Sequence, residues 1–157
     1  MSWRETRTTA LLKEKLTALG LELIDLGMET GCAALLRGGK PGPTVALRAD
    51  IDAIVQETPE DGEVVSEMPG VMHACGHDFH TAGLYGAACL LSPMREEIAG
   101  NVAFLFQPAE ETTGGARAML SHGLWDKLPG KPACVFGVHN RPQIPAGKVA
   151  VQEGPLM

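Results

Sequence analysis

The sequence predicts one α/β domain, a three-layer sandwich with a mixed, largely parallel central sheet and helices on both faces. Three short apolar runs show no alternation of apolar and polar residues and are rich in β-forming residues. Both features are typical of strands buried on both faces. Segments with helical spacing of apolar residues lie between these runs, and strands that alternate with helices indicate the α/β class. The length of 157 residues suits one domain that buries a core without disulfides.

The first expected elements are a helix and two strands. Apolar residues between positions 5 and 19 are spaced for one face of a helix, and Gly20 is suited to end it. Residues 21–26 and 32–36 are typical of two short strands, and a loop rich in glycine and proline follows at residues 38–43. The sheet is therefore expected to begin with these two strands.

The three apolar runs are expected to form the central strands, at residues 44–47, 101–106 and 133–138. Helices are expected between them, at residues 78–91 and 115–122. No repeat and no low-complexity segment interrupts this order, so the α/β prediction extends over the whole chain.

Polar residues that can bind ligands follow each of the three runs. They are Arg48, Asp50 and Asp52 after the first run, Gln107, Glu110 and Glu111 after the second, and His139 after the third. In open α/β sheets, ligands bind in the crevice beyond the carboxyl ends of the strands. We therefore predict that these residues share one site.

Composition and charge exclude several classes of protein. The net charge is −6, and no basic run is long enough to follow a phosphate backbone, so nucleic acid is not an expected partner. No apolar stretch approaches the roughly 18 residues that cross a bilayer, and residues 1–10 are too polar for a secretion signal. We therefore expect a cytoplasmic protein without a membrane partner, whose four cysteines are core residues or metal ligands and not disulfide partners.

The strongest local signal is the segment from His73 to His80, which holds three histidines, a cysteine and an aspartate within eight residues. Imidazole and thiolate are preferred ligands of zinc and similar metals, and Gly76 lets Cys75 and His77 converge. Asp78 is expected to cap the following helix. The alternative, a polar loop with helix-capping residues, is weaker because three of the five histidines fall in this window.

Glu110 and Glu111 form the second signal. Adjacent carboxylates at the end of a buried strand repel each other unless a cation offsets their charge. In extended backbone the two side chains would point in opposite directions, so that one could bind a metal while the other accepts a proton from water. The alternative is a solvated acidic turn. His139 alone would more often be a core residue, but its place after the third run favours a ligand.

Four segments in order resemble the amidohydrolase branch of the aminoacylase and carboxypeptidase G superfamily: residues 46–53, 69–78, 106–111 and 137–139. The resemblance covers nearly the whole chain. It implies hydrolysis of the amide bond of a small N-acyl amino acid, or of a small peptide, by a metal-dependent enzyme. It also implies two divalent metal ions, zinc or manganese, with nickel or cobalt as further candidates.

Carried over by position, the resemblance implies metal ligands at Cys75, His77, Glu111 and His139, a general base at Glu110, and a catalytic acidic residue near the metals at Asp50. The wider superfamily has a histidine ligand two positions before that aspartate. Arg48 stands there in this chain, so His77 is expected to take over the ligation. The thiolate at Cys75 makes the site softer than one built from carboxylates alone, which favours zinc.

The sequence also departs from its relatives. Ile54–Val55 stands where relatives usually have Leu-Pro, and relatives have additional helical sequence before the first helix. They also continue into a dimerisation or lid domain and then return with one more histidine ligand. Residues 1–157 are therefore expected to be a partial catalytic domain without the lid, incomplete at both ends, inactive alone, and inclined to form a homo-oligomer or to pair with a complementary fragment.

Two alternatives stay open. A non-catalytic metal-binding or regulatory protein derived from such an enzyme would have no reason to keep the base at Glu110. An exopeptidase or a deacetylase acting on a different amine shares every motif above.

Overall fold

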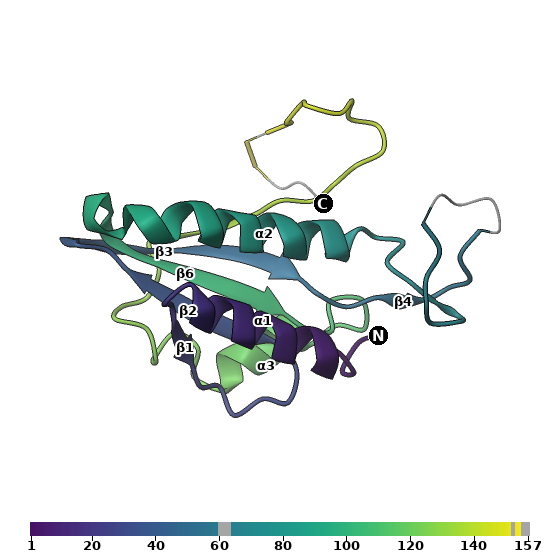
Figure 1. Cartoon of the computed structure of the whole chain (residues 1–157), viewed down its shortest axis with the longest axis horizontal. Helices are drawn as coiled ribbons and strands as arrows, with labels where there is room; N and C mark the ends of the chain where they lie inside the picture. The colour runs from purple at the N-terminus through teal and green to yellow at the C-terminus, as the bar shows by residue number, and fades with distance from the viewer. Residues whose placement is uncertain (60–63, 152, 155–157) are drawn as a thin grey trace.

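The computed structural model describes residues 1–59, 64–151 and 153–154. Its main sheet has five strands in the order β1-β2-β6-β3-β7, and helices cover both faces (Figure 1). The elements are α1 (Thr6–Ala18), β1 (Glu22–Ile24), β2 (Cys32–Arg37), β3 (Lys40–Asp50), α2 (His77–Leu91), a 3₁₀ helix η1 (Ser92–Glu97), β6 (Ala99–Gln107), α3 (Gly115–Ser121) and β7 (Cys134–Gly137). A separate small hairpin pairs β4 (Ile54–Val55) with β5 (Val71–Met72). Within the described ranges, no helix is long and apolar enough to cross a bilayer.

The strand directions confirm the mixed sheet. β3 pairs in parallel with both β6 and β7, whereas β2 pairs antiparallel with both β1 and β6. It follows that β1, β3, β6 and β7 share one direction and that β2 alone opposes them. The α/β class and the placement of helices on both faces are likewise as the sequence predicts.

Alternation along β2 divides the core between the two faces. Cys32, Ala34 and Leu36 face a cluster that includes residues of α1 and α2, while Ala33 and Leu35 face a cluster that includes Met119 of α3. Successive side chains of a strand point to opposite faces, so a strand without polar alternation is buried on both sides. Figure 1 shows α2 lying along the sheet above β3, and α3 on the far side.

The predicted loop at residues 38–43 is wrong for residues 40–43, because β3 already begins at Lys40. The pairing with β6 is irregular there: Lys40 faces Ala99, yet Thr44 faces Asn101, so the intervening residues form a bulge. A bulge admits the prolines of this stretch into a strand, because its unpaired residues need no backbone donor.

The prediction that residues 133–138 form a central, buried strand is also wrong. β7 lies at the edge of the sheet, and Val135, Phe136 and Val138 are 52%, 58% and 72% exposed. In the described part of the chain, β7 pairs only with β3. An apolar run is typical of a strand buried on both faces, but it does not reveal what lies on those faces.

The exposed edge strand β7 predicts that copies of the chain associate with one another. An unpaired strand edge with apolar side chains is a template for pairing with another chain, so the mass measured by light scattering should rise above that of one chain with concentration. Phe136→Lys should restore the monomer mass, because a charge at an edge opposes pairing. Leu90→Lys is the matched control, since Leu90 is 72% exposed on α2. A monomer at every concentration would contradict this prediction.

The sheet places the polar strand ends together, as predicted. Asp50 at the end of β3 faces Gln107 at the end of β6, and Arg48 faces Gly137 at the end of β7. The first turn of α2 begins at His77, beside the same edge. Residues far apart in the sequence therefore converge at the carboxyl ends of three parallel strands.

Candidate metal centre

His77 lies at the middle of this edge and is fully buried. Its Nδ1 is 2.9 Å from the carbonyl oxygen of Asp52 and 3.0 Å from Asp52 Oδ1. Both partners are acceptors, so Nδ1 carries a proton, and in the neutral ring Nε2 then presents a lone pair. Nε2 has no hydrogen-bond partner among the described residues. A buried polar atom without a partner is costly, and a second-layer carboxylate that fixes the tautomer is typical of a metal-binding histidine.

Three carboxylates surround this free nitrogen. Oε1 of Glu111 and Oδ2 of Asp50 each lie 3.7 Å from His77 Nε2, and Oε2 of Glu110 lies 4.0 Å away. These distances are too long for hydrogen bonds, but they suit ligands that each lie about 2 Å from a shared ion. Several carboxylates around one buried imidazole nitrogen fit a divalent cation.

The expectation that Glu110 and Glu111 point in opposite directions is wrong. The backbone here is a bend and a turn instead of an extended strand, and Ala109 just before it has a positive φ of 48°. The amide of Thr113 closes the turn by donating to the Glu110 carbonyl at 3.1 Å. Both carboxylates consequently approach His77, and with it they form a group whose ligand atoms lie within 4.8 Å of one another.

Cys75 and His139 form a second group with His77. Sγ of Cys75 lies 3.5 Å from Nε2 of His139, while His139 Nδ1 donates to the Asn140 carbonyl at 2.7 Å. Nε2 of His139 thus faces the Cys75 thiol, and the two atoms are close enough to bind one ion together. Burial raises the pKa of Cys75 to about 11, with further contributions from the hydrogen bond and charge of Glu111. A cation at this position would favour the thiolate.

Asp50 is held in its ionised form by its neighbours. Burial by itself would raise the pKa of this carboxyl, but the hydrogen bond from His80 and the charge of Arg48 lower it overall. His80 Nδ1 is 2.6 Å from Asp50 Oδ1, and Arg48 Nη1 donates to Oδ2 at 2.7 Å. Arg48 also donates twice to Gln107 Oε1, so this side chain orients the two strand ends. Asp50, His77 and His80 form the third candidate group.

Asp52 and His80 belong to the predicted strand-end group and to the histidine-rich segment, but the sequence assigns neither residue an individual role. Asp52 Oδ2 accepts hydrogen bonds from the Ser2 hydroxyl at 2.7 Å and the Glu111 amide at 3.1 Å. His80 connects Asp50 to Asn140: its Nε2 lies 2.6 Å from the side-chain oxygen Oδ1 of Asn140 and 3.1 Å from the backbone nitrogen of Asn140. Both side chains are buried polar groups. No spacing rule could have paired them with partners that lie 30 to 60 residues away.

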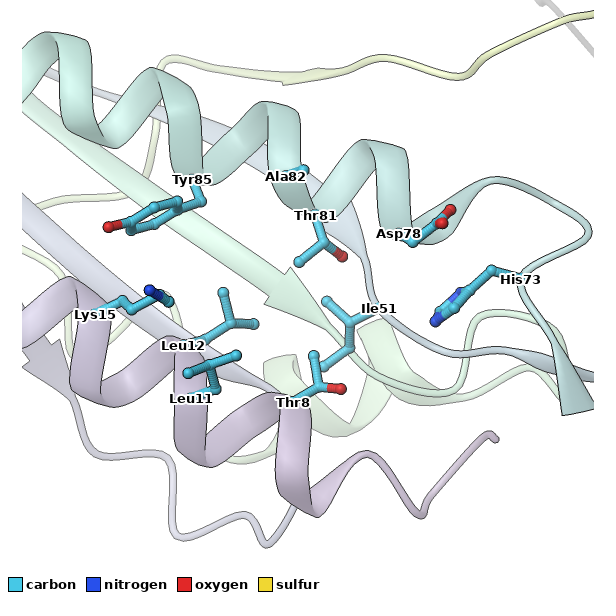
Figure 2. A pocket seen from close by; sticks show the side chains of 10 residues that line it. All are labelled: Thr8, Leu11, Leu12, Lys15, Ile51, His73, Asp78, Thr81, Ala82 and Tyr85. Carbon is cyan, nitrogen blue, oxygen red and sulfur yellow. The ribbon is translucent and has the colours of Figure 1, made fainter. Parts of the chain in front are cut away.

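His73 and Asp78 do not join the centre. Both line a cavity of about 340 Å³ between α1 and α2, with Lys15 and Tyr85 at its other end (Figure 2). Asp78 also does not cap α2 as predicted: Gly76 is the N-cap residue, and Asp78 accepts from the amide of Phe79 within the first turn. The left-handed φ of Gly76, 79°, starts the helix one residue earlier than expected.

Comparison with known proteins places this geometry in context. The sequence model of peptidase family M20/M25/M40 matches residues 46–154. N-acetylcysteine deacetylase from Bacillus subtilis (strain 168) is 42% identical over 158 residues, a match that covers 100% of this chain and 40% of the relative. Thermostable carboxypeptidase 2 from Saccharolobus solfataricus is 42% identical over 160 residues, again covering 100% and 40%.

A solved structure agrees closely with the fold. The YXEP protein of Bacillus subtilis, described as a dinuclear metal-binding peptidase from the M20 family, superimposes with a TM-score of 0.92 at 41% identity. The match covers 99% of this chain and 43% of that chain. The chain thus spans about two fifths of the length of these relatives.

Proposed function

Because the chain belongs to peptidase family M20/M25/M40, we propose that it carries the metal centre of an amidohydrolase that cleaves N-acyl amino acids. The observation that supports this most is the buried Nε2 of His77, which faces three carboxylates and has no hydrogen-bond partner in the part of the chain that the structure describes. A divalent ion would satisfy the nitrogen and offset the carboxylates together.

We assign metal ligation to Cys75, His77, Glu111 and His139. Two divalent ions bound there would supply Lewis-acid polarisation of the acyl carbonyl and would make the attacking water more acidic. Glu110 would take the proton of that water and return it to the leaving amine. Its side chain is 41% exposed, so water and substrate can reach the carboxylate. Asp50 would complete the centre as the acidic residue beside the metals.

Zinc or manganese is the proposed metal, with nickel and cobalt as further candidates. The thiol of Cys75 beside two imidazoles favours zinc, whereas the carboxylates also suit manganese. The cytoplasm is the proposed compartment, since a reducing environment keeps a ligand cysteine free of disulfides. Cys75 is a free thiol in the structure.

The proposed substrates are small N-acyl amino acids, because a relative at 42% identity is an N-acetylcysteine deacetylase. An exopeptidase acting on small peptides is the second candidate, since the thermostable carboxypeptidase 2 is equally similar. Both activities hydrolyse an amide with the same set of groups. They differ in the acyl side of the bond, so a panel of N-acetyl, N-benzoyl and indole-acetyl amino acids beside dipeptides distinguishes them.

Metal analysis tests the centre directly. The chain purified without chelator should hold at least one divalent ion tightly, and a chelator should remove it. Cys75→Ser and His139→Ala should each lower the metal content. Less than one bound ion per chain that neither substitution changes would contradict the ligand assignment.

Metal uptake should also depend on pH through Cys75. The thiol, with its pKa of about 11, is protonated at neutral pH and must lose its proton to bind a metal. Between about pH 7.5 and pH 9 the apparent metal affinity should therefore rise about tenfold per pH unit from this group. Competition with a chelator of known pH dependence measures the slope. Cys75→Ser should flatten it, and an equal slope in wild type and variant would contradict the role of the thiol.

A further inference from the structure

Glu5 is a buried carboxylate that the proposed chemistry does not use. It lies directly before α1 and is 4% exposed, yet its side chain makes no capping hydrogen bond to that helix. Oε1 instead accepts from the amides of Trp3 at 3.1 Å and Ala109 at 3.0 Å. Oε2 has no hydrogen-bond partner within the described ranges. Burial of a carboxylate costs free energy, so we expect Glu5 to have a structural or functional role at this position.

The partner of Glu5 is the residue that sets the course of the acidic turn. Ala109 is fully buried and has a φ of 48°, a left-handed conformation that is uncommon for a residue with a side chain. The carbonyl of Ala109 accepts a hydrogen bond from the Gly115 amide, so both the amide and the carbonyl of Ala109 are hydrogen-bonded. Glu110 and Glu111 follow directly, and the orientation of the Ala109 peptide decides where their carboxylates point.

A second contact links the same N-terminal segment to the other side of the turn. The Ser2 hydroxyl donates to Asp52 Oδ2, and this oxygen also accepts from the amide of Glu111. The segment from Ser2 to Glu5 thus reaches the acidic turn in two ways. Glu5 binds the amide of Ala109 directly, and Ser2 binds Asp52, which accepts from the amide of Glu111. Asp52 reaches His77 with its other oxygen.

We propose that Glu5 is a positioning residue that holds the Ala109 peptide in its left-handed conformation and thereby directs Glu110 and Glu111 toward His77. The proposal rests on the metal centre described above. Glu5 acts through the backbone of Ala109 and does not touch substrate or metal. Its single hydrogen-bonded oxygen is the functional atom, so glutamine, which keeps an oxygen at that place, should preserve the role, whereas alanine or the shorter aspartate should not.

Titration of the purified chain with Co²⁺ tests this. Glu5→Ala and Glu5→Asp should each weaken Co²⁺ binding about 10–100-fold, the range typical of losing an outer partner of a ligand. Glu5→Gln should stay near wild type. The thiolate-to-cobalt absorption should persist at saturation in every variant, because Cys75 comes from a different segment.

Ser92→Ala is the control for lost stability alone. Ser92 is buried in η1, where its hydroxyl bonds the Ala88 carbonyl away from the centre. It should lower the melting temperature without changing Co²⁺ affinity. Circular dichroism shows whether each variant is folded. Wild-type Co²⁺ affinity in a folded Glu5→Ala or Glu5→Asp chain would overturn the positioning role. If Glu5→Ala does not fold, Glu5→Asp alone decides the question. Absence of Co²⁺ binding by the wild type would instead contradict the metal centre itself.

Discussion

In a protein extended to the full length of its relatives, replacing Glu110 with glutamine should lower kcat for hydrolysis of an N-acyl amino acid by about 10²–10⁴-fold, the range typical of removing a general acid–base group. Glutamine keeps the size and hydrogen-bonding oxygen of the side chain but cannot take a proton from water. Metal content should stay at the wild-type value, because the proposed ligand in this turn is Glu111. Steady-state kinetics and metal analysis on the same preparations measure both quantities.

Glu111→Gln is the matched control for this experiment. Its carboxylate approaches His77 Nε2 to 3.7 Å, so its loss should reduce metal content and activity together. Loss of metal in Glu110→Gln with retention in Glu111→Gln would mean that the two roles are exchanged. Full activity in Glu110→Gln would exclude Glu110 as the base.

Replacing His77 with alanine should have the largest effect on metal binding. His77 belongs to all three candidate groups, whereas Cys75 and His139 belong to one each. Its removal should weaken binding by more than the about 10–100-fold typical of an outer partner, and by more than Cys75→Ser or His139→Ala does. Chelator competition on the purified chain gives the dissociation constants.

His73→Ala is the control for His77→Ala, because His73 lies in the same part of the sequence but lines the cavity between α1 and α2 (Figure 2). It should leave metal binding unchanged. Equal losses in His73→Ala and His77→Ala would show that the effect reflects damage to the loop and not the loss of a ligand.

The sequence predicts the class of fold and the edge where the site lies, because apolar runs identify strands and polar residues at their ends identify a shared edge. It does not predict that β7 is exposed, since the run from Cys134 to Gly137 looks the same whether or not another layer covers it. It also misses the start of β3, because the prolines that usually break a strand lie in the bulge between the Lys40–Ala99 and Thr44–Asn101 pairs.

The candidate site, like the fold, could be predicted only in part. Cys75, His77 and His139 are chemically distinctive, so they stand out in the sequence, and the structure brings them together. Their roles as ligands, and that of Glu110 as base, stay predictions. The orientation of Glu110 and Glu111 could not be predicted, because it depends on the left-handed Ala109 and on the hydrogen bond that the Ala109 amide donates to Glu5, 104 residues earlier.

The three contacts of Asp52 have a consequence for how the protein is maintained in a cell. One carboxylate joins Ser2, His77 and Glu111, which come from three distant segments. An ion bound at His77 would stabilise all three against local opening, by about 2.7 kcal/mol at a free concentration 100 times its dissociation constant. Amide hydrogen exchange at Glu111 and proteolysis near the N-terminus would therefore slow together on metal loading. The abundance of the protein would follow the supply of metal, because chains without metal would be degraded first.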